Sequence, residues 1–403
     1  MQVTVERLGH LGDGIADGPV YSARMLPGEV IEGDVEGNRM AAPRILRPAE
    51  TRVSAPCRHY KGCGGCALQH ATDKFVQDWK VGVVRTALSA VGIEAWVRRV
   101  HTSPPASRRR ATFAGRRTKS GASVGFHAPA SDIIRAVPDC LLVTQSLRSA
   151  MPFLEDIVEA GASRKGEIRL LATETGSGID LDAQGGKPLT KELHTRLASL
   201  ADKANLARLT WNDEPVATFR PPFQMFGTVR VVPPPGSFLQ ATVEGEAALR
   251  NSVEDALDGS GPVLDLFSGC GTFALPLAKT RPVHSVEDNA EMLAALDMGW
   301  RQGDGLSAVT TERRDLFRRP LTPDEMAPFS GVVIDPPRAG AERQMIELAQ
   351  SDVSRIAFVS CNPSTFARDA ALLVQAGYKL EWIDVVDQFR WSPHVELAAA
   401  FVR

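Results

Sequence analysis

The sequence contains no apolar run that approaches the length of a membrane span, which argues against an integral helical membrane protein. Its first residues, Met1–Arg7, have the features of neither a signal peptide nor a transit peptide, so we expect a cytoplasmic protein. Excess charge is also missing, because the formal net charge is −2. Any binding to nucleic acid must therefore come from a local basic patch.

With 403 residues, the chain is long enough for two or three domains, each with its own core. Sequence patterns divide it into residues 1–52, 53–235 and 236–403. The first segment has short strand-like stretches punctuated by glycines, and we expect a small OB-like β-barrel there. Such barrels often bind RNA, but Glu29 and Glu32 make one strand acidic, so an RNA-binding role of this barrel stays open.

Cysteine is scarce, with six residues in the chain, but four of them form a distinctive pattern. Three lie in a compact C-x5-C-x2-C motif whose glycines free the backbone to wrap around a metal centre, and a fourth follows farther along. Four thiolates suit either zinc or an iron–sulfur cluster. Zinc sites more often have two paired C-x2-C knuckles, so we favour the cluster. The four predicted ligands are Cys57, Cys63, Cys66 and Cys140.

Residues 73–91 have helical periodicity, with Thr72 or Asp73 as the cap. We assign the apolar stripe of this helix, which includes Phe75 and Trp79, to the core. The next charged stretch, Arg98–His101, is counted with the basic region that follows it.

The window Ser107–Lys119 is rich in arginine and contains neither Asp nor Glu. Strand-like alternation predicts several guanidinium groups on one face, with aromatic side chains among them. Arginine pairs bidentately with phosphate and stacks on bases, so an RNA-binding track is favoured over an ordinary solvated basic face. The candidate RNA contacts are Arg108, Arg109, Arg110, Arg116, Arg117 and Phe126.

From about residue 236, strands alternate with helices, which predicts an α/β sheet with its ligand site at the carboxyl ends of the strands. The strand Pro262–Phe267 runs into a glycine-rich loop that contains Gly269, Gly271 and Thr272. The next strand ends in Glu287, which can accept both ribose hydroxyls of an adenosine cofactor. This pattern suits NAD as well as S-adenosylmethionine.

Two later buried strands also end in reactive side chains. One stops at Asp335 before two prolines, and the next stops at Cys361 before Asn-Pro. Most free cysteines are small buried hydrophobes, but a thiol at this edge of a sheet is a candidate nucleophile. Residues 380–387 and 394–401 have no helix between them. They predict an antiparallel hairpin at the sheet edge, which favours a methyltransferase-type sheet over a dinucleotide fold.

Together these motifs resemble the bacterial RNA 5-methyluridine methyltransferase family, from the cysteine triplet to the C-terminus. The first fifty residues are similar, more loosely, to the TRAM domain of that family. One departure is Arg390–His394, which replaces the family's usual Pro-x-Thr lead-in to His-Val-Glu. The matching stretches are Cys57–Cys66, Asp265–Phe273, Ile334–Gly340, Val359–Thr365, Ala367–Asp369 and His394–Glu396.

The resemblance implies an α/β fold with a class I S-adenosylmethionine-dependent methyltransferase sheet and a central α+β region that holds the cluster and binds RNA. It implies that Cys361 is the nucleophile and Glu396 the general base. The cysteine set matches the [4Fe–4S] ligands of the ribosomal-RNA branch, so 23S rRNA is favoured over tRNA as the partner; we also expect a monomer. The implied cofactor contacts are Gln240, Phe267, Glu287, Asp335 and, more weakly, Asp315.

These residue types fit the chemistry by themselves. A thiolate that adds to C6 of uracil makes C5 nucleophilic towards a sulfonium methyl group, and a carboxylate can then remove the C5 proton. The target base must be unpaired or flipped out to reach the pocket. Two other classes stay open: a nicotinamide-dependent oxidoreductase with an iron–sulfur domain, and a non-catalytic RNA-binding protein.

Overall fold

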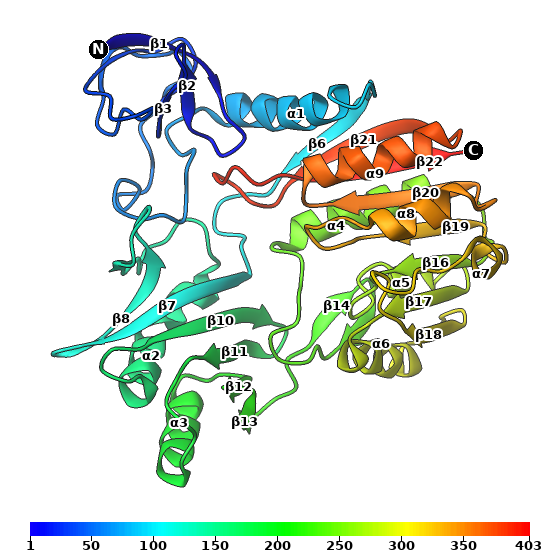
Figure 1. Cartoon of the computed structure of the whole chain (residues 1–403). Coiled ribbons are helices and arrows are strands. Elements are labelled where there is room, and N and C mark those ends of the chain that lie inside the picture. Colours follow the sequence, from blue (N-terminus) through cyan, green and yellow to red (C-terminus); the bar gives the residue numbers. More distant parts are fainter.

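A computed structural model describes all residues, 1–403, which form three main sheets (Figure 1). The N-terminal sheet has five antiparallel strands in the order β3-β2-β1-β4-β5. Val5, Ala16 and Ile31 fill its small core. The strand order is open and does not itself close a barrel. The strands are β1 (Gln2–Leu8), β2 (Gly14–Ala16), β3 (Val20–Ser22), β4 (Val30–Glu32) and β5 (Arg44–Arg47).

Glu29, which we expected on an acidic face of this sheet, is instead fully buried. Its carboxylate accepts hydrogen bonds from the backbone N–H groups of Leu26 and Ala49 and from the guanidinium of Arg52. The residue therefore joins the sheet to the segment that follows it. It adds no negative charge to the surface.

The central region is a seven-stranded sheet in the order β13-β12-β11-β10-β7-β8-β9, with α2 (Gln145–Gly161) and α3 (Lys191–Lys203) packed against it. Phe113, Leu170 and Trp211 are fully buried in its core. The strands are β7 (Arg110–Thr118), β8 (Gly121–His127), β9 (Ile134–Arg135), β10 (Glu167–Thr175), β11 (Gly178–Gln184), β12 (Arg208–Trp211) and β13 (Glu214–Thr218).

The third sheet has eight strands in the order β18-β17-β16-β19-β20-β22-β21-β6, with parallel pairing from β18 to β20. Its strands are β6 (Val97–Thr102), β16 (Val263–Leu266), β17 (Val283–Glu287), β18 (Val309–Arg313), β19 (Gly331–Ile334), β20 (Arg355–Ser360), β21 (Lys379–Asp387) and β22 (Glu396–Val402).

Helices cover both faces of this sheet (Figure 1). One core packs α1 (Asp73–Ser89), α8 (Glu342–Ala349) and α9 (Pro363–Gln375) against the strands. The other core lies under α4 (Val243–Ala256), α6 (Ala290–Gln302) and a small hairpin of two strands. The remaining elements are β14 (Gln224–Phe226), β15 (Val229–Val231), α5 (Ala274–Leu277) and α7 (Pro323–Met326). None of the helices combines the length and apolar character needed to cross a membrane.

The terminal strands differ from the expected arrangement. The hairpin of β21 and β22 does form, but it does not lie at the sheet edge, because β22 pairs with β20 and β21 pairs in parallel with β6. The third sheet therefore takes α1 and β6 from the segment that the sequence assigned to the central region. Charge hid β6, because Arg98 and Arg99 pair with Asp384 and Asp255, which lie far away in the sequence.

A buried ion pair fastens α1 to this sheet. Lys80 Nζ donates to Asp387 Oδ1 at 2.6 Å and to the carbonyl of Phe389 at 3.3 Å. The two charged side chains are 1% and 2% exposed. The pair holds the end of β21, where the loop towards β22 begins.

We expect Lys80→Met to lower the free energy of unfolding by about 3–5 kcal/mol, because it leaves the Asp387 carboxylate buried without a partner. Denaturant titration followed by circular dichroism measures the loss. Lys74→Met is the matched control, because the Lys74–Asp78 pair is exposed and such pairs contribute about 1 kcal/mol or less. Equal losses for the two variants would contradict this role of Lys80.

Candidate active site

The glycine-rich loop after β16 has the geometry of a ligand cradle. Phe267 and Gly269 have φ angles of 60° and 54°, so the chain turns sharply as it leaves the strand. A Cβ added to Gly269 would meet no atom within 4 Å, so this side of the loop faces open space. A Cβ on Gly271 would come within 2.9 Å of Leu296 Cγ, so the loop can pack here only with glycine. Thr272 follows in the same loop, half-buried, before α5.

Glu287 lies at the end of β17, beside this loop. Its carboxylate accepts hydrogen bonds from the backbone N–H of Gly269 at 3.2 Å and of Asn289 at 2.9 Å. Unpartnered buried atoms lie nearby in the sequence: both carboxylate oxygens of Asp265, and the hydroxyls of Ser268 and Ser285. Such atoms are usually satisfied by a polar ligand or water, so the residues present fit an adenosine cofactor at this place.

The loop after β18 adds Asp315 and an aromatic side chain. Asp315 Oδ1 accepts hydrogen bonds from the N–H groups of Phe317 and Arg318. The ring of Phe317 packs on that of Phe267, with 5.5 Å between centroids. Sequence reasoning missed Phe317, because it belongs to no motif and meets Phe267 only in the fold.

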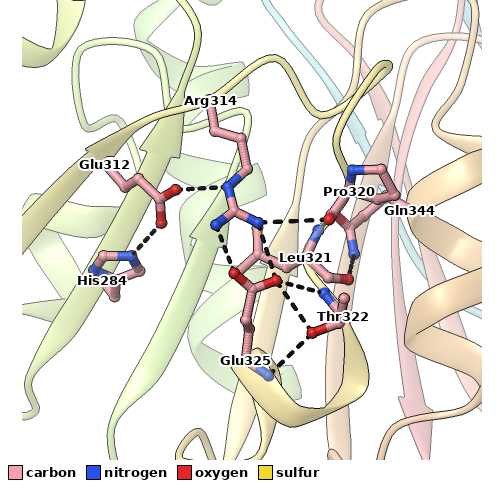
Figure 2. Close-up of polar contacts among 8 residues, drawn as sticks. All are labelled: His284, Glu312, Arg314, Pro320, Leu321, Thr322, Glu325 and Gln344. Carbon is pink, nitrogen blue, oxygen red and sulfur yellow. Dashed lines mark hydrogen bonds and ion pairs between the residues drawn. The ribbon is translucent and has the colours of Figure 1, made fainter.

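Figure 2 shows how this loop is held. Arg314 donates to Glu312 on one side and to both carboxylate oxygens of Glu325 on the other. Hydrogen bonds from Arg314, and then from the backbone of Thr322, lower the pKa of Glu325 to about 2. Gln344 exchanges two hydrogen bonds with the backbone of Leu321. The segment that carries Asp315 is therefore anchored at both ends.

Cys361 and Glu396 meet at the carboxyl edge of the sheet. The antiparallel register pairs Ser360 with Leu397, so Cys361 and Glu396 are the next residues along the two strands. Asp335 follows β19, the strand beside β20. The sequence placed these three side chains at strand ends, and the fold brings those ends together.

The electrostatics of this cluster oppose ionisation. Burial, and then the charges of Glu396 and Asp335, raise the pKa of the Cys361 thiol to about 11, while Arg338 acts in the opposite direction. Burial raises the pKa of Asp335 to about 7. Burial, and then Asp335, raise the pKa of Glu396 well above its usual value. Positive charge supplied to the site would therefore favour the thiolate.

Gln240 connects this cluster to the central region. It is 2% exposed, and its Nε2 donates to Asp335 Oδ2 at 3.4 Å. Its carbonyl accepts from Arg109 Nε. A second buried glutamine, Gln388, donates to both Gln240 and Glu396. Sequence reasoning missed Gln388, because its partner Gln240 lies 148 residues away.

A cleft of about 890 Å³ leads to Cys361 between three parts of the chain. The catalytic edge of the third sheet forms one wall, and α1 and the N-terminal sheet form the others. Phe75 and Trp79 are half-buried and line this cleft, so their assignment to the core was wrong. Further lining residues are Arg7, His10, Arg338 and His394.

The four predicted metal ligands line one small, mostly apolar pocket together with Phe126, Val137 and Leu142. Burial raises the pKa of Cys66 to about 12, and the neighbouring thiols act in the same direction. Two of the sulfurs accept backbone hydrogen bonds, Cys63 from Gly65 and Cys140 from Leu142. No group of three or more His, Cys, Asp or Glu side chains is arranged to hold a single metal ion.

The predicted basic track is divided by the fold. Arg109 is 6% exposed and pairs with Glu246 at 2.5 Å, so its assignment to an exposed RNA-binding face was wrong. This partner was invisible in the sequence because it lies 137 residues away. Arg116 is paired with Asp132 and Glu167.

The other candidate contacts have different surroundings. Arg108 donates to the carbonyl of Arg110, and Arg110 donates to that of Gly236. Phe126 packs on Phe113 and lines the cysteine pocket, so it is no free stacking platform. Arg117 makes no ion pair and lines a surface pocket with Thr118, Lys119 and Arg164.

Comparison with known proteins agrees with this geometry. Residues 300–403 match the family model described as tRNA (Uracil-5-)-methyltransferase. The chain is 42% identical to an uncharacterized RNA methyltransferase of Brucella suis biovar 1, over 100% of this chain and 98% of the relative. It is 32% identical to the 23S rRNA (uracil(1939)-C(5))-methyltransferase RlmD of Pseudomonas putida, over 99% of this chain and 93% of the relative.

The fold has a solved counterpart. The crystal structure of Pyrococcus abyssi tRNA (uracil-54, C5)-methyltransferase in complex with S-adenosyl-L-homocysteine matches with a TM-score of 0.78 and 22% identity, over 100% of this chain and 99% of that one. The named relatives are methyltransferases of RNA, which decides against both the nicotinamide-dependent oxidoreductase and the non-catalytic RNA-binding protein. The chain therefore belongs to the RNA (uracil-5-)-methyltransferase family of S-adenosylmethionine-dependent enzymes.

Proposed function

We propose that this enzyme methylates C5 of a uridine in 23S rRNA, with Cys361 as the nucleophile and Glu396 as the general base. The observation that carries this proposal is the meeting of the two side chains at the ends of β20 and β22. Cys361 also opens into the cleft between α1 and the N-terminal sheet. A target base that is flipped into this cleft would reach the thiol and the carboxylate together.

The reaction follows from the residues in three steps. The Cys361 thiolate bonds to C6 of uracil, and the C5–C6 π electrons become an enolate with carbanion character at C5. S-adenosylmethionine, when bound, supplies the electrophilic methyl group that C5 takes. The Glu396 carboxylate then removes the C5 proton, the C5–C6 double bond forms again, and the Cys361 thiolate leaves.

The cofactor would be held along the carboxyl edge of the sheet. Glu287 would accept the ribose hydroxyls, while Gly269, Gly271 and Thr272 would let the loop approach closely. Phe267 and Asp315 would bound the adenine side, and Gln240 and Asp335 would bound the side that faces Cys361. The open space at Gly269 and the unpartnered polar atoms of Asp265 and Ser268 support this placement. The positive charge of a sulfonium would also lower the pKa of the thiol.

The four cysteines would hold a [4Fe–4S] cluster with a structural role. In such a cluster each thiolate binds a different iron, so the sulfurs need not converge on one point as they do around a single zinc ion. The apolar pocket and the backbone hydrogen bonds to Cys63 and Cys140 support this donor set. The mechanism requires no electron transfer from the cluster.

We expect anaerobically purified protein to be brown and to contain about four iron and four sulfide ions per chain. Cys66→Ser should lose most of both, as measured by elemental analysis and visible absorbance. Cys270→Ser is the matched control, because Cys270 is buried but lies outside the pocket. Colourless wild-type protein with stoichiometric zinc would contradict the cluster.

RNA would be bound outside the cleft by the basic hairpin of β7 and β8. Arg117, Lys119 and Arg164 share a surface pocket that has no acidic residue. Clustered cations of this kind bind phosphates. We expect the triple alanine variant to weaken RNA binding and to reduce the salt dependence of the binding constant, by about 0.7 per lost contact on single-stranded RNA. An unchanged salt slope would show that this pocket does not contact RNA.

The choice of 23S rRNA rests on the four cysteines and on the 32% identity to RlmD. A tRNA target is the alternative. Mass-spectrometric mapping of 5-methyluridine in separated rRNA and tRNA, with and without the gene, tests the choice. Loss of one site in 23S rRNA is the expected result, and loss only in tRNA would overturn the target but keep the chemistry. A cytoplasmic location and a monomeric state stay predictions.

A further inference from the structure

Gln388 occupies a central place behind the two proposed catalytic groups. It lies between β21 and β22 and is 1% exposed. The neighbouring α4 leaves room for it, because a Cβ on Gly245 would approach Gln388 Cβ to 2.6 Å. The side chain is therefore held from behind by α4 and faces the ends of the strands.

The orientation of its amide is determined by a backbone donor. The N–H of Ala241 donates to Gln388 Oε1 at 2.6 Å. A backbone N–H is always a donor, so the oxygen of Gln388 must point towards it. The NH2 group consequently points in the other direction.

That NH2 group has two acceptors. Gln388 Nε2 donates to Gln240 Oε1 at 2.5 Å and to Glu396 Oε2. The first bond in turn orients Gln240, whose Nε2 then faces Asp335. One amide thus sets the direction of the proposed base and of a proposed cofactor contact.

We propose that Gln388 is the positioning residue for Glu396, which rests on the proposed function of that carboxylate. The bond from Gln388 engages Oε2 and leaves Oε1 to accept the C5 proton. Around Glu396, the titratable groups are Asp335 at the end of β19 and Cys361 at the end of β20, both anionic when ionised. The amide of Gln388 is the donor that keeps Glu396 aimed in this otherwise repulsive site.

The step that depends on this donor is the last one. Thiolate addition and methyl transfer do not use Glu396, whereas removal of the C5 proton does. Loss of the donor should therefore slow the resolution of the covalent enzyme–RNA adduct more than its formation. A residue with only a structural role would lower the amount of active protein and leave the ratio of these two rates unchanged.

The experiment measures both rates in single turnover, with an unmodified transcript of the RNA in which mapping places the product. Gln388→Met keeps the size of the side chain but removes the donors, and we expect adduct resolution to slow about 10- to 100-fold, the usual effect of a hydrogen bond to a charged group. Methyl transfer into the adduct should change less than about threefold. Gln350→Met is the matched control, because Gln350 is exposed at the end of α8.

Two further variants keep the test informative if Gln388→Met folds poorly. Gln388→Glu retains an acceptor for the Ala241 N–H but removes the donors, and Gly245→Ala pushes Gln388 from behind. Both should accumulate adduct on a denaturing gel. Normal adduct resolution in a folded Gln388→Met or Gln388→Glu protein would overturn the inference while wild-type methylation stands. Absence of methylation by the wild type would instead overturn the proposed function, and the inference with it.

Discussion

Cys361→Ala is expected to abolish methyl transfer, with a loss of at least about 10⁴-fold in kcat, as for other enzymes that lose their covalent nucleophile. C5 of uracil is a poor nucleophile until a thiolate has added to C6, and no other thiol lines the cleft with Cys361. The measurement is the incorporation of radiolabelled methyl groups from S-adenosylmethionine into RNA.

Cofactor binding serves as the control for this variant. Cys361 belongs to the strand end that faces the substrate cleft, whereas the proposed cofactor contacts belong to the loops after β16, β17 and β18. Calorimetry should therefore give the same dissociation constant for S-adenosylmethionine in the variant and the wild type. Methylation by Cys361→Ala at a tenth of the wild-type rate would contradict the covalent mechanism.

Glu396→Gln is expected to stop the reaction after methyl transfer, because the amide cannot take the C5 proton. Loss of a general base typically costs about 10²–10⁴-fold in the step that uses it. The enzyme should then remain joined to methylated RNA through Cys361. A denaturing gel measures this adduct as a protein band that carries both labelled RNA and labelled methyl.

The double variant Cys361→Ala/Glu396→Gln is the control, because it has no thiol to form the adduct. An adduct that also forms in this double variant would place the bond on another residue. If Glu396→Gln turns over at the wild-type rate and forms no adduct, Glu396 is not the base.

Much of the site could be predicted because parallel strands bring their carboxyl ends to one edge. Asp265, Asp335 and Cys361 each follow a continuous apolar stretch, so their place in the fold could be derived from local sequence. Glu287 could be placed for the same reason. Thr72 caps α1 as expected, and its side chain accepts from the N–H of Phe75.

The failures have a common physical cause, which is compensation between distant residues. Arg109 looked free in a window without acids, but the fold buries it against Glu246 on α4. Arg98 made β6 look like a surface segment, although it pairs with Asp384 on β21. Trp79 looked like a core residue because periodicity does not reveal which side of a helix meets a second domain.

The most direct test of the covalent account uses RNA that contains 5-fluorouridine at the target position. Glu396 can remove a proton from C5 but not a fluorine, so the enzyme should be trapped after methyl transfer. Mass spectrometry of the digested adduct should find one peptide, the one that contains Cys361, joined to a methylated fluorouridine nucleotide. A trapped nucleotide on any other residue, or complete turnover without a trapped species, would contradict the account.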